Sequence, residues 1–157
     1  MIKENAEDVK FSKFDFIELY CALNFGYSCS SIIVHEDFKR KLYELYLDDE
    51  FKELFEDILP VKDKMFPESN YMDLDTALMM AQALGLLRLV NGVGKTKSII
   101  AFDESLMFEI LENYDEEVIN KMAKLVCRVN GLDDPVFSSD DSEMIRIRSP
   151  KNRFSSR

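Results

Sequence analysis

Histidine, cysteine and tryptophan are scarce in this sequence of 157 residues, which has one His, three Cys and no Trp. The three cysteines form no C-x-x-C pair, and their odd number does not suit the even disulfide framework common in secreted domains of this size. The one histidine has no second His or Cys nearby at metal-ligand spacing. The sequence therefore predicts a reduced, cytoplasmic protein without a metal or other cofactor.

Long apolar runs and an excess of basic residues are also missing. The longest uncharged run, residues 19–34, is interrupted by polar side chains and is shorter than the ~20 apolar residues that span a bilayer. The first ten residues lack the basic-then-apolar order of a signal peptide. The 20 basic and 30 acidic residues give a net charge of −10, which disfavours wholesale binding to nucleic acid or to anionic membranes. We expect no membrane partner.

The composition is that of a globular protein, and helical periodicity predicts most of its secondary structure. Hydrophobic residues make up 46% of the chain, with 12 Phe and 6 Tyr to fill a core. Ser12 and Asp15 match a capping box, and the helix they start is apolar nearly all round until Gly26, which favours a central position. Further helices are expected over about 35–47, 48–60, 73–84, 103–114 and 115–131. Their expected aspartate caps are Asp48, Asp73, Asp103 and Asp115.

A β-hairpin is predicted after the helix over 73–84. Gly85 ends that helix, residues 86–90 and 97–102 are predicted as strands, and the sequence Asn-Gly-Val-Gly at 91–94 supplies the turn. Residues 60–72 hold two prolines and no clean period, so we expect a loop there. Residues 32–34 are either a short strand or the lead-in to a helix. The buried face of the helix over 73–84 is expected to hold Leu74, Ala77, Leu78, Ala81 and Leu84.

The segment over 73–114 resembles the second half of a winged-helix domain. Its helix ends at Gly85, the pair Leu86-Leu87 opens a hairpin, and Asp103 starts the next helix. The resemblance implies a mostly α fold with one β-hairpin, in which residues 11–133 form a single winged-helix-like domain. Residues 1–10 are then a flexible N-terminus, and residues 134–157 are an acidic linker and a basic tail. The stretch 60–72 departs from the family, because a tight helix-turn-helix has a turn of only 3–4 residues.

DNA binding, which the resemblance implies, is disfavoured by the helix over 73–84. A helix that reads the major groove offers Arg, Lys, Asn or Gln to base edges. This helix offers Gln82 alone, and Asp73 and Asp75 would meet the phosphates with the wrong sign. The positions predicted to face away from the core are Asp75, Thr76, Met79, Gln82 and Ala83.

No catalytic constellation emerges from the sequence, and we predict that the protein is not an enzyme. Gly94-Lys95-Thr96 looks like the end of a phosphate-binding loop, but the motif needs a glycine where this chain has Leu89, and a strand follows instead of a helix. A His–Cys pair would need His35 beside Cys21 or Cys29. Cys21 falls on a buried face, and Cys29 lies in a serine-rich turn without a local signature.

Two further groups of residues have ordinary structural explanations. The acidic cluster over 48–57 is expected to be a helix cap and a solvated face, although it also fits an acidic surface that mimics nucleic acid. The methionines are expected to be flexible core filler: Met65, Met72, Met79, Met80, Met107 and Met122.

The charge of the chain changes sign near its C-terminus. Residues 1–143 carry a net charge of −15, and the last 14 residues carry +5. Within these, Met144-Ile145-Arg146-Ile147-Arg148 alternates like a strand that could add to a sheet edge, in this chain or in a partner.

These features favour a non-enzymatic protein–protein interaction module, a small regulatory or accessory subunit of a bacterial-type multi-protein system. The expected partner-binding residues are Arg88, Lys95 and Lys97 of the hairpin and Ile145, Arg146, Ile147 and Arg148 of the tail. One alternative is a winged-helix DNA-binding transcriptional regulator, a homodimer through its terminal helices. The other is an acidic inhibitor that mimics nucleic acid.

Overall fold

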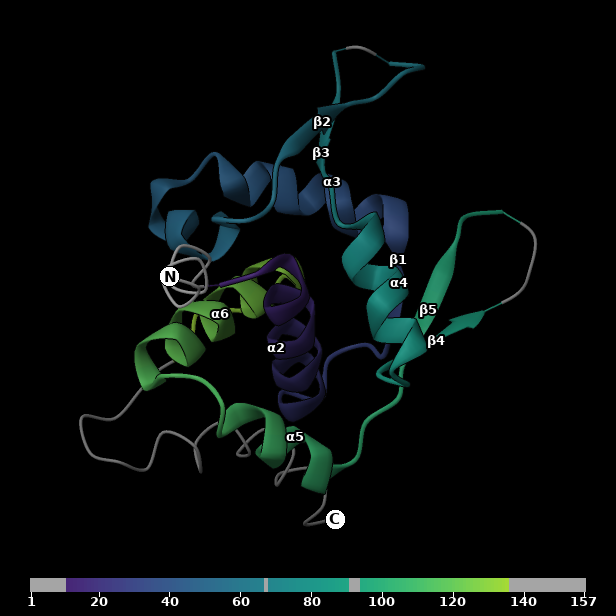
Figure 1. The fold of residues 1–157 in the computed structure, drawn as a ribbon. Coiled ribbons are helices and arrows are strands. Elements are labelled where there is room, and N and C mark those ends of the chain that lie inside the picture. The colour runs from purple at the N-terminus through teal and green to yellow at the C-terminus, as the bar shows by residue number, and fades with distance from the viewer. Residues whose placement is uncertain (1–10, 67, 91–93, 136–157) are drawn as a thin grey trace, which may run out of the picture.

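The computed structural model describes residues 11–66, 68–90 and 94–135, and this part of the chain is largely helical, as predicted (Figure 1). Its helices are α2 (Lys13–Gly26), α3 (His35–Tyr46), the 3-10 helix η1 (Asp49–Phe55), α4 (Asp75–Ala83), α5 (Glu104–Leu111) and α6 (Glu116–Val129).

Helix α2 lies at the centre of the molecule, with α4, α5 and α6 packed around it (Figure 1). The capping box is confirmed: Ser12 Oγ accepts from the Asp15 N–H at 3.0 Å, and the Asp15 carboxylate accepts from the Ser12 N–H at 3.0 Å. Leu19 and Leu23 have no exposed area. Because both sides of α2 are apolar, it can be covered on several sides at once, which organises one core around it.

A three-stranded antiparallel sheet flanks the helices. Its strands are β1 (Ile32–Val34), β4 (Leu87–Val90) and β5 (Lys97–Ile100), in the order β1-β5-β4. Ile33 pairs with Ser98, and Arg88 pairs with Ile99. Residues 32–34 are therefore a strand, and the predicted hairpin is confirmed in its two strands. The turn at 91–93 lies outside the described residues.

The expected loop over 60–72 is wrong, because the segment contains a second hairpin. Strands β2 (Pro60–Lys62) and β3 (Asn70–Met72) pair antiparallel and project from the helical body (Figure 1). Asp63 shapes the turn: its Oδ1 accepts from the Met65 N–H at 2.8 Å and from the Phe66 N–H at 3.2 Å. Strands of three residues are too short to show the alternation by which a strand is recognised in sequence.

Two of the four predicted aspartate caps are confirmed. Asp48 accepts from the Glu50 N–H at 3.0 Å, although the helix that it starts is 3-10, and Asp103 accepts from the Leu106 N–H at 2.8 Å. Asp115 occupies the N-cap position of α6 without a side-chain cap bond. The prediction for Asp73 is wrong, because α4 starts one residue later than expected, with Leu74 at the cap position.

The far end of α4 also differs from the prediction. The helix ends at Ala83, and Gly85, with a φ of +85°, turns the chain into β4. Leu84 was expected on the buried face, but its side chain is 65% exposed. Leu84 occupies the C-cap position, just beyond the last helical residue, and faces solvent, whereas Leu86 and Leu87 after the turn are buried again.

Candidate functional site

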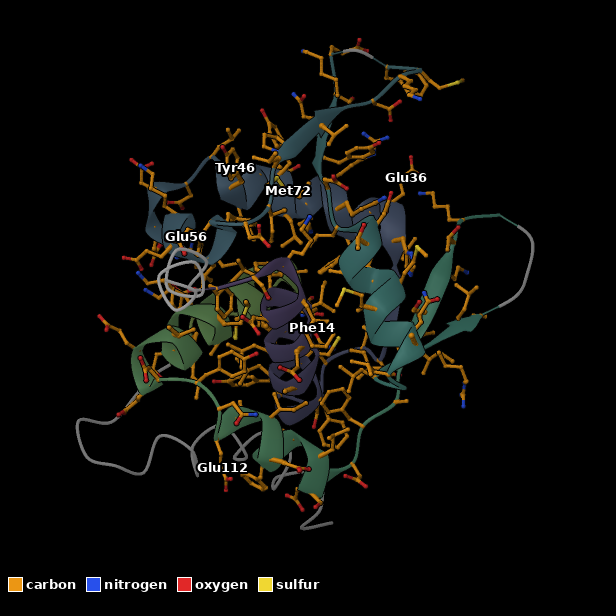
Figure 2. The ribbon with its side chains drawn as sticks, in the orientation of Figure 1. Phe14, Glu36, Tyr46, Glu56, Met72 and Glu112 are labelled. Carbon is orange, nitrogen blue, oxygen red and sulfur yellow. The ribbon has the colours of Figure 1, made fainter. Side chains whose placement is uncertain are left out.

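An open groove of about 830 Å³ lies between the two hairpins. Helices α3 and α4 supply most of its wall, β3 and β4 contribute one residue each, and residues 94–96 close it next to β5. Figure 1 shows α4 between the two projecting hairpins, and Figure 2 shows Glu36, one of the lining residues, on the same side of the molecule.

Ion pairs tie the walls of the groove together. Lys39 of α3 places its Nζ 2.6 Å from Asp75 Oδ1 of α4 and 4.9 Å from the ring centre of Tyr71 on β3. Next to it, Arg40 pairs with Glu36 at 2.9 Å and with Asp63 at the turn of the β2–β3 hairpin. These contacts fix both the β2–β3 hairpin and the start of α4 relative to α3.

A small polar network forms the floor of the groove. His35 Nε2 lies 2.7 Å from Ser98 Oγ, which also accepts from Gln82 Nε2 at 3.3 Å. Burial and the nearby Lys39 ammonium lower the pKa of His35 below its usual value. A Ser–His contact resembles that of a serine nucleophile and its base. Ser98 is 0% exposed, however, so its hydroxyl cannot reach a substrate in this arrangement and instead joins β5 to α3 and α4.

The predicted partner-binding residues of the hairpin do not form one cluster. Arg88 and Lys97 lie on the same face of the β4–β5 hairpin, the face opposite to Ser98 and Leu87, and neither makes an ion pair with a described residue. Lys95 instead pairs with Asp37 at 3.0 Å, with both side chains more than half exposed. The predicted tail residues Ile145, Arg146, Ile147 and Arg148 lie outside the described residues.

The outer side of α4 carries an exposed, mainly apolar row of residues, which sequence analysis identified only in part. Met79 is 67% exposed, Met80 43% and Leu84 65%, and Leu89 of β4, 47% exposed, continues the row into the groove. We call this set the α4 stripe: Thr76, Met79, Met80, Ala83, Leu84 and Leu89.

The α4 stripe is one of two apolar faces of the same helix. The opposite face, Ala77, Leu78 and Ala81, is buried, so α4 is already packed against the core on that side. Thr76, Met79 and Ala83 were correctly predicted to face outward. Residues 76, 79, 80, 83 and 84 of the stripe follow the spacing i, i+3, i+4, i+7 and i+8. This spacing places side chains on one face of a helix, where a second helix can pack.

The methionines fall into two classes. Met72, Met107 and Met122 have no exposed area, so they are core filler as predicted, and Met72 lies at the base of the β2–β3 hairpin (Figure 2). For Met65, Met79 and Met80 the same prediction is wrong, since all three are exposed. Exposed methionines with little polar surface around them are typical of protein contact surfaces.

The acidic cluster at η1 has a structural role. Glu50 Oε2 pairs with Lys124 at 2.5 Å, Glu53 pairs with Lys121 at 2.7 Å, and Arg128 reaches Glu50 at 3.3 Å. These ion pairs hold η1 against α6. Because basic residues of the same chain engage much of the cluster, it offers less negative charge to a partner than its sequence suggests.

The cysteines do not form a reactive site. Cys21 is fully buried, and burial raises the pKa of its thiol. Burial also raises the pKa values of Cys29 and Cys127, each to about 11. A nucleophilic cysteine needs a lowered pKa, and the His35 ring lies within hydrogen-bond distance of the Ser98 hydroxyl and not of a thiol among the described residues.

Comparisons with known proteins give no further guide to the site. No protein-family model, no curated protein and no solved structure matches this chain. Within the ranges that the structure describes, no helix has both the length and the apolarity to cross a membrane. The same residues contain no group of three or more His, Cys, Asp or Glu side chains placed to hold a metal ion.

Proposed function

We propose that the chain is a winged-helix-like domain that acts as a protein–protein interaction module, a small regulatory or accessory subunit. Two features support the fold: the strand order β1-β5-β4, and the position of α4 immediately before the β4–β5 hairpin. In this arrangement α4 occupies the place of a DNA-reading helix, and β4 and β5 form the wing.

The observation that carries the function is the chemistry of the α4 stripe. A helix that reads DNA presents basic and amide side chains to base edges and phosphates. Here the most exposed large hydrophobic residues at that position are Met79 and Leu84. Thioether and leucine side chains gain free energy by leaving water against another apolar surface, not against a phosphate backbone. The stripe therefore favours a protein partner.

The β4–β5 hairpin, which follows α4, indicates a second feature of the partner. Arg88 and Lys97 add two positive charges on the adjacent hairpin, without an ion-pair partner among the described residues. Because Arg88 and Lys97 lie on the sheet face opposite to Leu89, a partner that covers Met79 and Leu84 would bring carboxylates to these two cations by also reaching around the edge strand β4.

DNA binding is the second candidate, and those same two cations are the observation that favours it. The wing of a winged-helix domain can contact phosphate, and Arg88 and Lys97 have the right charge for that role. An affinity that depends on phosphate contacts falls steeply with salt, whereas an apolar interface depends on salt far less. Salt dependence therefore separates the two candidates.

The test is a capture experiment with three versions of the full chain. The wild type, M79E/L84E and a matched control, L47E/L59E, are immobilised and exposed to nuclease-treated lysate of the organism that encodes the protein. In the control, two side chains that are 63% and 70% exposed outside the stripe receive the same substitution. We expect a protein that the wild type and the control retain and that M79E/L84E loses. Equal retention by all three proteins, or loss of all partners on nuclease treatment, would contradict the proposal.

A further inference from the structure

Strand β1 forms the opposite edge of the sheet from β4, and no strand among the described residues pairs with its outer side. The His35 N–H donates to Thr96 O at 2.9 Å, and the Ile100 N–H donates to Ser31 O at 2.8 Å, so residues 31, 33 and 35 bond toward β5. In an antiparallel pair the residues between them direct their backbone groups the other way. Ser30 Oγ accepts the Ile32 N–H at 3.2 Å. The edge thus presents the Ile32 carbonyl and the Val34 N–H.

A groove of about 210 Å³ runs along this open edge. Among the described residues, its walls come from α2, β1, α3 and the end of α6, and not from β5, which places it on the outer side of β1. Ile32 and Val34 line it together with the buried ring of Phe38. Ile32 is 51% exposed. The groove therefore combines an open backbone edge with apolar side chains that another strand could cover.

The chain leaves its last helix beside this groove. Val129 and Asn130, at the end of α6, line it. Arg128 Nε pairs with Asp134 Oδ1 at 2.9 Å, so residue 134 stays close to the end of α6. The nine residues 135–143 can span up to about 30 Å when extended. Residues 144–148 are thus within reach of the β1 edge.

We propose that residues 144–148 add to the open edge of β1 as a further strand of the same chain. Their alternation places Ile145 and Ile147 on one face, where they can cover Ile32 and the groove, and Arg146 and Arg148 on the other. The Ile32 carbonyl and the Val34 N–H supply two backbone hydrogen bonds to the added strand, whichever its direction.

Charge supports an occupant from the same chain. The last 14 residues carry +5 and the preceding 143 carry −15, so the tail is attracted to the body as a whole. Within the groove itself Asp37, which pairs with Lys95, lies near Lys41, so the attraction comes from the net charge of the body. This inference does not rest on the proposed function, because it concerns the β1 edge of the sheet, whereas the α4 stripe lies on α4 and, through Leu89, on the opposite edge strand β4.

The test is hydrogen exchange of the Val34 amide, followed by NMR in the full chain. I145S/I147S removes the two side chains proposed to cover β1. The control, M144S/F154S, removes two other apolar side chains of the tail. We expect the Val34 amide to exchange at least about tenfold faster in I145S/I147S than in the wild type, and at the wild-type rate in the control.

Two results would overturn the proposal. One is the same Val34 exchange rate in all three proteins, which would mean that the tail does not cover β1. The other is a protection of Val34 that rises with protein concentration, which would mean that the strand comes from a second copy. An unchanged thermal midpoint of both variants verifies that the body remains folded.

Discussion

Leu78 and Leu84 allow a direct comparison of how the two apolar faces of α4 contribute to stability, because one of these leucines is buried and the other is exposed. Leu78 is 1% exposed and Leu84 is 65% exposed. Truncating a buried leucine to alanine removes its packing and leaves a cavity, at a cost of about 2–5 kcal/mol. The same truncation at an exposed position without special contacts changes stability by about 0.5 kcal/mol or less.

The two variants are compared with the wild type by urea and thermal unfolding, monitored by circular dichroism at two protein concentrations. For a chain of this length 1 kcal/mol corresponds to about 2–4 °C, so L78A should lower the Tm by roughly 4–20 °C and L84A by no more than about 2 °C. A loss with L84A as large as that with L78A would refute the reasoning, because Leu84 would then be covered in the free protein. A loss that depends on protein concentration would identify a second copy as the cover.

Three smaller predictions concern local interactions. S12A removes the side-chain acceptor of the α2 capping box and should cost about 1 kcal/mol in urea unfolding, whereas an unchanged midpoint would contradict the cap. R128A loses ion pairs to Glu50 and Asp134 at the surface, so it should cost about 1 kcal/mol or less, and the difference from wild type should shrink in 1 M NaCl. Burial lowers the pKa of His35, so below a pH of about 6.5 the unfolded chain binds more protons there than the folded chain. Stability should therefore fall as the pH drops through 6.5 toward the folded pKa. The stability of H35Q should fall less over that range than the stability of the wild type. An equal fall in both proteins would exclude His35 as the cause.

Local signals in the sequence were sufficient for most of the helices. The start of α2 depends on Ser12 and Asp15, which are three residues apart, and the start of α5 depends on Asp103 and the N–H of Leu106. Such short-range bonds are visible in the order of the residues. The β4–β5 hairpin was predictable for the same reason, since two apolar strands flank a glycine-rich turn.

Contacts between distant residues account for what the sequence did not predict. The β2–β3 hairpin consists of three-residue strands, and Arg40 holds its turn through Asp63, which is 23 residues away. The floor of the groove depends on His35 and Ser98, which are 63 residues apart. No local pattern encodes such a pair. The sequence offers one indirect sign of this contact: Ser98 is a polar residue on the core-facing side of a predicted strand, where it needs a hydrogen-bond partner.

The α4 stripe shows that hydrophobic periodicity alone does not predict which face of a helix is buried. Both faces of α4 are apolar, and periodicity marks residues that share a face without saying which face meets the core. Thr76, Met79 and Ala83 were placed outward correctly, but Leu84 was placed inward and Met79 and Met80 were also counted as core filler. The core already holds Leu78 on the other side, so the outer residues have no described neighbour to cover them fully.

The measurement that tests the central claim most directly is a titration of the captured and purified partner at low and at physiological salt. The wild type, M79E/L84E and the control L47E/L59E are compared. If the α4 stripe is the contact surface, M79E/L84E loses at least about 30-fold in affinity, the control binds like the wild type, and salt changes the wild-type affinity only modestly. Equal affinities of all three proteins would contradict the proposed surface. Tight, steeply salt-dependent binding of the wild type to duplex DNA would contradict the proposed function itself.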